Sequence, residues 1–458
     1  MPKHNFDYDL IVVGSGAAGS VAAEIAARAG RKVAIVEENT LGGSAPTLSD
    51  VPVGALMAAA HTFDEARRGS AFGLRTATIG YNYPSVKKWK DLAIHRSGAT
   101  ATGEYLRNRG VSVFKGRAHF LSPNEVSIGR RHLTANKFLI ATGSSISTPD
   151  IVGVGSVECL TPETAIDLLR LPKSMLIIGA GTIGVQFAEL FAIFGTKVYL
   201  ADIKKRILPD EDDEVSEVMT DVLTRLRGVE ILTSARVIAV NSESPLVRVT
   251  YLNGAVEHSI KVEKVLIATG RTPNVDLGLE NAGVDYDKTG IKTDEFLNTS
   301  ARNIYAAGDV LGRFSKTHSA LYESRIAANN LLGKNKIAPN YAAIPRVIWT
   351  SPEIASVGMT EKDLTREDVK FHRSTVQNSI IPRSNIANFA AGFSKVLTGP
   401  KGELLGATVV APHAAETINE ISLAINNGLT AQDVANIVHP FGSWSEVLRL
   451  ACAKARTK

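Results

Sequence analysis

The stretch Asp9–Glu38, DLIVVGSGAAGSVAAEIAARAGRKVAIVEE, reads as a strand, a glycine-rich turn, a helix and a second strand. The apolar run Leu10–Val13 has strand length, and an alanine-rich helical pattern follows Gly19. Gly14 permits a tight turn, Gly16 lets the backbone approach a pyrophosphate, and Gly19 lets helix and strand pack closely. The stretch therefore predicts a dinucleotide site rather than an ordinary βα turn without ligand.

An acidic residue completes this motif. Glu37 ends the second apolar run, 18 residues after Gly19, where a carboxylate can accept hydrogen bonds from a ribose. The predicted contacts of the first dinucleotide from this motif are Gly14, Gly16, Ala17, Ala18, Gly19 and Glu37.

The same pattern occurs a second time at Ser174–Asp202, and Asp202 again lies 18 residues after the last glycine of its turn. Later echoes, FLIATG at Phe138–Gly143 and VLIATG at Val265–Gly270, indicate a duplication. Two such units predict two bound dinucleotides, because each pyrophosphate needs its own helix N-terminus. The predicted contacts in the second unit are Gly179, Gly181, Thr182, Ile183, Gly184 and Asp202.

The composition is that of a globular protein: 458 residues, 44% hydrophobic and 21% charged, with a net charge of +5. The basic clusters are short, so we expect no nucleic-acid partner. Two cysteines, Cys159 and Cys452, allow neither a disulfide framework nor a metal-binding spacing, and we expect no metal. The polar N-terminus MPKHNFDYD and the absence of a long apolar run predict a cytoplasmic protein without a membrane span.

Further motifs extend over nearly the whole chain: Leu41-Gly42-Gly43, Gly270-Arg271-Thr272-Pro273-Asn274, Ala307-Gly308-Asp309-Val310, Ser351-Pro352-Glu353 and Ser445-Glu446. With the two glycine turns, they resemble the flavoprotein disulfide reductase family of dihydrolipoamide dehydrogenase, glutathione reductase and mercuric reductase. The resemblance implies an α/β fold with two Rossmann-like dinucleotide-binding domains and an α+β C-terminal dimerisation domain.

The resemblance also implies domain borders, cofactors and partners. We expect an FAD-binding domain from residues 1–148 and 271–337, an NAD(P)-binding domain at 149–270 and a dimerisation domain at 338–458. FAD would occupy the first unit and NAD the second, in a homodimer. The further residues that the resemblance assigns to FAD are Gly43, Ser44, Ala141, Thr142, Gly143, Arg271, Gly308 and Asp309, and Gly270 is assigned to NAD.

The sequence departs from the family where the redox-active cysteine pair is expected. In the stretch Leu41–Gly54 the first cysteine position is Ala45 and the second is Asp50. Thiol–disulfide exchange requires a thiolate, which neither side chain supplies. The family's usual chemistry on lipoamide, glutathione disulfide or mercuric ion is therefore not expected.

A second departure removes a charge pair. The family lysine that follows the cysteines is Gly54 here, and its glutamate partner is Gln186. Removing one partner of a buried pair costs about 3–5 kcal/mol, and losing both avoids that cost. The paired loss predicts a remodelled but folded flavin site.

A third departure affects the C-terminal base. An ungapped alignment from Ser445-Glu446 places the family's catalytic histidine at Phe441, whereas a two-residue insertion would keep His439 in that role. In both alignments the pairing of a base with Glu446 is in question. A chain without a dithiol does not need that base to accept its proton.

Three roles have alternatives. Asp50 precedes a helical run, where it would cap the helix N-terminus or else carry a catalytic proton. Phe441 and Trp444 would form the core of an interface or else stack on substrate. Asp202 favours NADH because a carboxylate repels a 2′-phosphate, whereas the nearby basic run 204–206 would favour NADPH.

Together these features predict an FAD-dependent NAD(P)H oxidoreductase that passes hydride from NADH to a non-disulfide acceptor such as a quinone. A transhydrogenase or NADH oxidase that uses the same flavin is an alternative, as is a non-catalytic FAD/NAD-binding redox sensor. Overall similarity alone would suggest a dihydrolipoyl dehydrogenase, which the missing cysteines contradict.

Overall fold

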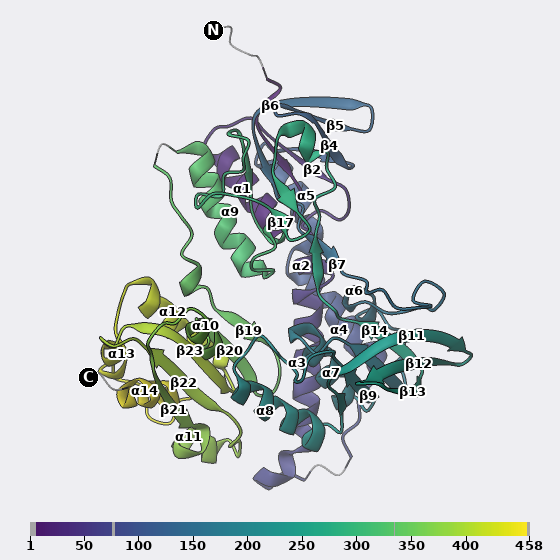
Figure 1. The fold of residues 1–458 in the computed structure, drawn as a ribbon, viewed down its shortest axis with the longest axis vertical. Helices are drawn as coiled ribbons and strands as arrows, with labels where there is room; N and C mark the ends of the chain where they lie inside the picture. The colour runs from purple at the N-terminus through teal and green to yellow at the C-terminus, as the bar shows by residue number, and fades with distance from the viewer. Residues whose placement is uncertain (1–5, 76–77, 334, 456–458) are drawn as a thin grey trace. The chain divides into compact units, whose positions relative to one another are not determined.

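The computed structural model describes residues 6–75, 78–333 and 335–455 (Figure 1). Residues 1–5, part of the polar N-terminus discussed above, lie outside the described ranges. The chain forms two compact units: Met1–Ala55, Ser85–Ser147 and Gly270–Pro339 make the first, and Leu56–Pro84, Thr148–Thr269 and Asn340–Lys458 make the second. The sequence predicted four finer domain segments, and their borders stay a prediction.

A parallel sheet forms the centre of the first unit. Its strands run in the order β3-β2-β1-β6, and β18 pairs with the other side of β6. Leu10–Val13 of β1 and the whole of β2 are buried, as expected for parallel strands covered on both faces. The strands of the first unit, including those outside this sheet, are β1 (Tyr8–Val13), β2 (Val33–Glu37), β3 (Ser112–Lys115), β4 (Ala118–Ser122), β5 (Glu125–Ile128), β6 (Arg131–Ile140), β7 (Ser144–Ile146), β15 (Arg271–Pro273), β16 (Tyr286–Asp287), β17 (Gly290–Ile291) and β18 (Ile304–Ala306).

The register of this sheet aligns the carboxyl ends of its strands. Val13 of β1 pairs with Val36 of β2 and with Ile140 of β6, and Ile140 pairs with Ala306 of β18. The turns that follow these strands therefore lie at one edge, where doubly wound sheets bind their ligands. The helices are α1 (Ala17–Arg28), α2 (Ser44–Thr47), α4 (Tyr83–Arg96), α5 (Thr102–Asn108) and α9 (Thr317–Leu332); α3 (Asp50–Arg67) begins in this unit and ends in the second.

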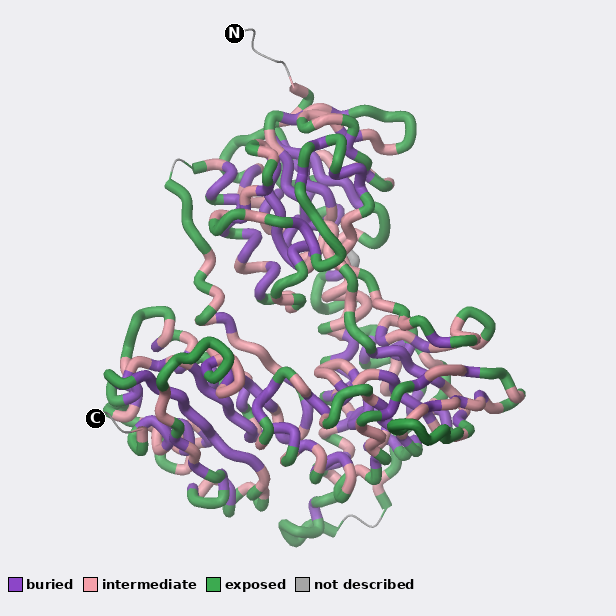
Figure 2. The backbone as a smooth tube through the Cα atoms, viewed as in Figure 1, coloured by how far each residue is buried: buried purple, intermediate pink, exposed green. Residues whose placement is uncertain are grey.

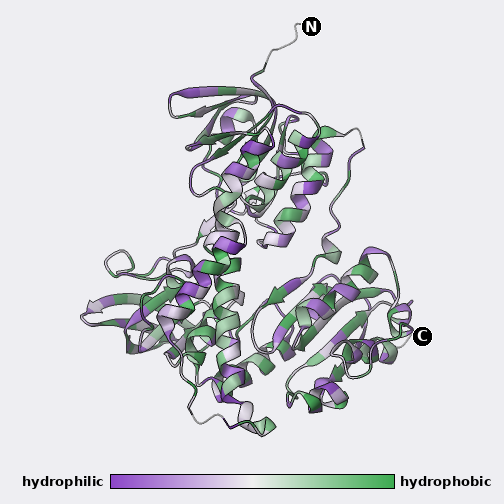
Figure 3. Cartoon of the chain, turned by 180° about the vertical axis from the view of Figure 1, so that it is seen from behind, coloured by the Kyte–Doolittle hydropathy of each residue, from purple (hydrophilic) through white to green (hydrophobic). Residues whose placement is uncertain are grey.

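Two helices of the first unit pack on each other. Helix α9 lies along α1, and Ser324 Oγ donates to the carbonyl of Ala18. Buried small residues on both helices allow this close approach. Figure 3 shows hydrophilic and hydrophobic residues alternating along α9, as expected for a helix with one face in the core.

The second unit contains a four-stranded parallel sheet of order β10-β9-β8-β14 and a three-stranded antiparallel sheet of order β11-β12-β13. Burial is concentrated along the strands, as the purple tube in Figure 2 shows. The elements are α6 (Pro162–Ala165), β8 (Ser174–Ile178), α7 (Thr182–Ile193), β9 (Lys197–Ala201), α8 (Asp213–Asp221), a π-helix (Val222–Leu226), β10 (Glu230–Leu232), β11 (Ala235–Glu243), β12 (Leu246–Asn253), β13 (Val256–Val262) and β14 (Lys264–Ile267).

The C-terminal part of this unit is an antiparallel sheet of order β19-β20-β23-β22-β21. Helix α12 packs on β20 and β23, and α14 packs on β21 and β22. This arrangement confirms the predicted fold class, a mixed α/β chain with an α+β C-terminal region. The elements are β19 (Arg346–Ile348), β20 (Glu353–Gly358), α10 (Glu361–Arg366), β21 (His372–Gln377), α11 (Pro382–Ile386), β22 (Phe393–Thr398), β23 (Leu404–Ala411), α12 (Ala414–Asn426), α13 (Ala431–Ala435) and α14 (Ser445–Lys454).

Candidate functional site

The first glycine turn connects β1 to α1 at the carboxyl edge of the first sheet. Gly14 has φ +99°, and a Cβ on it would lie 2.2 Å from the carbonyl oxygen of Ala141. A Cβ on Gly19 would lie 1.8 Å from the carbonyl oxygen of Gly14. Larger residues cannot occupy either position without moving backbone, which explains both glycines without reference to a ligand.

Glu37 fastens this turn from the end of β2. Its Oε2 accepts from the backbone N–H of Ser15 at 2.8 Å and from the Ser15 hydroxyl at 2.7 Å, and its Oε1 accepts from the N–H of Asn39 at 2.6 Å. A carboxylate has about four acceptor positions, so one more remains for a ribose hydroxyl. The geometry is compatible with the predicted ribose contact.

The start of α1 suits a pyrophosphate. Gly16 occupies the N-cap position with no side-chain cap, so no side chain takes up the amides of the first turn. A Cβ on Gly16 would meet only the Cα of Gly43, at 3.9 Å, in otherwise open space. Uncapped amides beside open space, at a helix N-terminus, fit the phosphates of FAD.

Asp309 follows β18 at the same edge. Its Oδ2 accepts from the Ser144 hydroxyl at 2.7 Å, and that hydroxyl in turn accepts from Nε of Arg271 at 2.8 Å. Burial raises the pKa of Asp309, and the charge of Asp50 raises it further, whereas the Ser144 hydrogen bond and Arg271 lower it. The predicted FAD residues Arg271 and Asp309 therefore meet in one hydrogen-bonded group.

The segment that replaces the cysteine pair forms α2 and the start of α3. Ala45 lies within α2, and Asp50 is the first residue of α3. The side chain of Asp50 does not act as the predicted cap, because its Oδ2 instead accepts a hydrogen bond from the hydroxyl of Thr317. The expectation of a helix-capping role is thus wrong: the tertiary contact with α9 takes the carboxylate.

The second glycine turn repeats the first in its bonding. Gly179 has φ +104°, and Asp202 Oδ2 accepts from the N–H of Ala180 at 2.6 Å. Asp202 Oδ1 accepts from the N–H of Lys204 at 2.8 Å. A Cβ on Gly181 would meet nothing within 4 Å, and no side chain caps α7. This turn also fits a dinucleotide.

Arg206, which could have bound a 2′-phosphate, has a partner within the protein. Its guanidinium pairs with the carboxylate of Asp213. Lys204 and Lys205 are exposed. The balance of charges near Asp202 is therefore less basic than the sequence of the 204–206 run indicates.

Gln186, at the family's glutamate position, lies on α7 and accepts a hydrogen bond from the N–H of Trp349 at 3.3 Å. One turn later Glu189 is fully buried; it accepts from the N–H of Ser351 at 3.0 Å and pairs with Arg227 at 3.3 Å. Neither Glu189 nor Arg227 was predicted from the sequence. An acidic residue within the apolar helix segment FAELFAIF was the available signal.

His439 and Glu446 do not contact each other, and each has a different partner. Glu446 Oε2 accepts from the N–H of Gly442 at 2.7 Å. His439 instead lies 3.1 Å from Glu420 through Nε2 and 2.9 Å from the carbonyl oxygen of Ile437 through Nδ1. Within the chain, His439 and Glu446, whose pairing the sequence left open, are therefore engaged with other groups.

The two aromatic residues of this segment differ. Phe441 is 83% exposed in the chain, whereas Trp444 is 6% exposed and packs edge-on against Phe389. Trp444 belongs to the core of the C-terminal region and has little surface left for an interface, so its predicted place there stays a prediction. Phe441 remains available to an interface.

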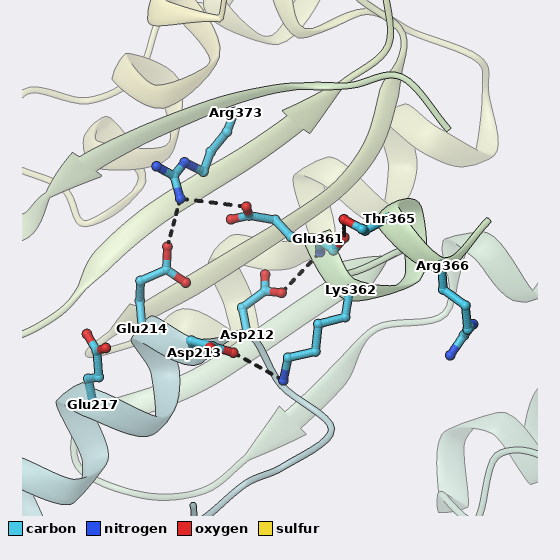
Figure 4. Close-up of a pocket in the computed structure, with 9 residues that line it drawn as sticks. All are labelled: Asp212, Asp213, Glu214, Glu217, Glu361, Lys362, Thr365, Arg366 and Arg373. Atoms are coloured by element: carbon cyan, nitrogen blue, oxygen red, sulfur yellow. Dashed lines mark hydrogen bonds and ion pairs between the residues drawn. The ribbon is translucent and has the colours of Figure 1, made fainter. Parts of the chain in front are cut away.

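A shallow hollow elsewhere in the second unit has a different character (Figure 4). Beside it, the fully buried Lys395 lies 2.7 Å from Asp212, 3.0 Å from Glu214 and 2.7 Å from Glu361. Burial lowers the pKa of Lys395, but hydrogen bonds to Asp212 and Glu361 outweigh burial and leave the pKa raised. These charges neutralise one another, and we assign the cluster to structure.

Two further findings concern metal ions and membranes. Among the described residues, no group of three or more histidine, cysteine or acidic side chains is arranged to hold a metal ion. In the same ranges, no helix is both long and apolar enough to cross a membrane.

Comparison with known families gives matches over most of the chain. A family model described as pyridine nucleotide-disulphide oxidoreductase matches residues 8–324. The model of the dimerisation domain of pyridine nucleotide-disulphide oxidoreductases matches residues 344–452.

Individual relatives agree with these matches. A mercuric reductase of Bacillus cereus is 33% identical over 98% of this chain and 71% of its own length. A dihydrolipoyl dehydrogenase of Bacillus subtilis (strain 168) is 33% identical over 96% of this chain and 94% of its own length. Among solved structures, the HOCl-induced flavoprotein disulfide reductase RclA from Escherichia coli, as its Cu(II) complex, superimposes with a TM-score of 0.86 at 26% identity, covering 97% of this chain and 99% of that one.

Proposed function

Because the chain belongs to the pyridine nucleotide-disulphide oxidoreductase family, whose members use FAD and NAD(P), we propose that it passes electrons from NADH to an acceptor that is not a disulfide. A quinone is the acceptor class that best suits the site. One observation carries the proposal: the stretch Leu41–Gly54 contains no cysteine.

The two cysteines elsewhere do not replace the missing pair. Burial raises the pKa of the Cys159 thiol. Burial, together with the charge of Glu420, raises the pKa of Cys452 to about 12, and that side chain is fully buried. Disulfide exchange requires a thiolate that can reach its substrate. Neither thiol meets that requirement near neutral pH.

The chain's own residues would bind and orient the reactants. The uncapped amides of α1 would hold the FAD pyrophosphate and Glu37 its ribose, while Asp309 and Arg271 would contact the flavin end. FAD, when bound, supplies the capacity to take a hydride from NADH and release two electrons to an acceptor. Ala45, smaller than a bridged cysteine, would leave room for a planar acceptor.

We further propose a preference for NADH over NADPH. The Asp202 carboxylate, held by two backbone N–H groups, would accept ribose hydroxyls and repel a 2′-phosphate. The pairing of Arg206 with Asp213 supports this preference, because it occupies a guanidinium that would otherwise attract the phosphate.

The match to the dimerisation domain supports a homodimer. Large apolar side chains are exposed on the C-terminal region of the single chain, among them Val438 at 93% and Phe441 at 83%. Ile437, Val438 and Phe441 are all exposed within five positions of the chain, and apolar side chains that gather in this way fit a surface that a partner covers.

An acceptor screen on the purified holoenzyme tests the proposal. NADH and NADPH are each supplied as electron donor in parallel assays. The acceptors tested with each are quinones, thio-NAD, oxygen, lipoamide and glutathione disulfide. We expect turnover of quinones and none of either disulfide. Turnover of thio-NAD or oxygen alone would instead identify a transhydrogenase or an NADH oxidase, and lipoamide turnover at an ordinary enzymatic rate would refute the proposal.

A further inference from the structure

Asp50 places a carboxylate at the carboxyl edge of the first sheet. It is the first residue of α3, it is exposed, and its Oδ2 accepts from the hydroxyl of Thr317. Thr317 is the first residue of α9, 267 positions later in the chain. This contact fixes one oxygen of the carboxylate and leaves Oδ1 free to face a ligand or water.

The surroundings of Asp50 belong to the predicted cofactor edge. Gly43, which lies seven residues before Asp50 in the sequence, packs against Gly16 of the first glycine turn. Asp309, which follows β18, is close enough for the charge of Asp50 to raise its pKa, in addition to the larger effect of burial. A ligand that extends from the glycine turn toward Asp309 along the strand ends therefore passes close to Asp50.

Asp50 is also the only carboxylate in the stretch Leu41–Gly54. Ala45, at the other substituted position, has no proton to exchange. The remaining polar side chains of the stretch are the hydroxyls of Ser44, Thr47 and Ser49, which are poor acids. A carboxyl group is a competent general acid when it lies within reach of the reacting atom.

We propose that Asp50, positioned by Thr317, donates the proton that accompanies electron transfer to the acceptor, so that the acceptor class is one that takes up two electrons together with protons, as a quinone does. This inference rests on the proposed function and deepens it. Asp50 is the catalytic residue of this step, and Thr317 is a positioning residue.

The reaction balances without a further reactant. NADH loses a hydride and becomes NAD+, and the quinone gains the two electrons and one hydrogen of that hydride. The O–H bond of the Asp50 carboxyl group breaks as an O–H bond of the hydroquinone forms. The exposed carboxylate then takes a proton from water, so that the sum is NADH + H+ + quinone → NAD+ + hydroquinone.

The experiment compares a quinone with ferricyanide, which takes one electron and no proton. Asp50→Asn keeps an oxygen for the Thr317 hydroxyl but has no proton to donate. We expect it to lower the ratio of quinone to ferricyanide turnover by about 100-fold, a typical loss for a general acid.

Three further variants separate catalysis from folding. Thr317→Val should lower the same ratio by less than Asp50→Asn does, and Thr317→Ser, which retains the hydroxyl, should restore it. Glu65→Gln removes an exposed carboxylate from the same helix and should leave the ratio unchanged. Flavin content and thermal unfolding of all four variants show that the fold is intact.

The outcomes are distinct. If NADH bleaches the flavin of the unmodified enzyme but no quinone is turned over, the proposed acceptor is wrong and the role of Asp50 is refuted with it. If quinone turnover is present and Asp50→Asn does not change the ratio, the inference about Asp50 is refuted and the proposed function stands. A solvent deuterium isotope effect on the quinone reaction that Asp50→Asn does not alter would also count against Asp50.

Discussion

The two glycine turns of this chain share one design but differ in what surrounds them. In both, a carboxylate at the end of the second strand accepts a hydrogen bond from the backbone N–H of the residue after the first glycine. Ser15 donates to Glu37 at 2.8 Å, and Ala180 donates to Asp202 at 2.6 Å. Around the first turn, Gly43 packs so closely that a Cβ on it would lie 2.6 Å from the Cα of Gly16. Around the second, a Cβ on Gly181 would meet nothing within 4 Å.

This difference suits two dinucleotides with different residence times. A turn against which a second backbone segment packs, beside the open space in front of Gly16, is suited to a cofactor that stays bound, as FAD would. An open turn is suited to a nucleotide that must enter and leave in each catalytic cycle, as NADH would. The motif itself is the same, so the contrast comes from the segments that follow each acid.

The largest effect is expected from Gly43→Ala. Gly43 has φ +73°, and the methyl group of an alanine there would collide with Gly16. The backbone at position 43 must therefore move away from the first turn. We expect the ratio of flavin to protein absorbance to fall at least about tenfold, which corresponds to roughly 1.4 kcal/mol of binding free energy. Gly155→Ala is the matched control, since Gly155 lies in open space without positive φ and should retain flavin.

A smaller loss of binding affinity, for the nicotinamide nucleotide only, is expected from Gly181→Ala. The fold has room for the methyl group, but the space it enters is where the second pyrophosphate would approach the backbone. Flavin content should stay normal while the KM for NADH rises about tenfold, again roughly 1.4 kcal/mol. An unchanged KM would show that the nucleotide does not approach this turn.

Asp202→Asn tests the acid of the second turn. The amide keeps an oxygen that can accept a backbone N–H but removes the negative charge that repels a 2′-phosphate. The ratio of kcat/KM for NADPH to that for NADH should increase about tenfold or less, since one charge contact is changed. A ratio that falls would mean that Asp202 does not face the ribose.

The smallest effect is expected from Arg206→Ala. Its ion pair with Asp213 is partly exposed, and such pairs contribute only about 0–1 kcal/mol. We therefore expect the NADPH to NADH ratio to change by less than about threefold. A collapse of NADPH turnover would instead identify Arg206 as a phosphate ligand and weaken the assignment of NADH.

The sequence by itself determined both glycine turns, the acids Glu37 and Asp202, and the absence of the cysteine pair. These features are local: a tight turn, a helix start and a strand end are set by neighbouring residues and by the space a side chain requires. The repetition of this local pattern predicted two dinucleotide-binding units, and the resemblance to the flavoprotein disulfide reductases implied the rest of the fold class.

Only the tertiary structure decided the partners of the substituted residues. Asp50 looked like a helix cap, yet its carboxylate contacts Thr317, 267 residues away. Whether His439 pairs with Glu446 stayed open from the sequence, and in the structure the two residues contact Glu420 and Gly442 instead. A side chain with several possible partners takes the one that packing brings within reach, and the spacing of residues along the chain does not encode that choice.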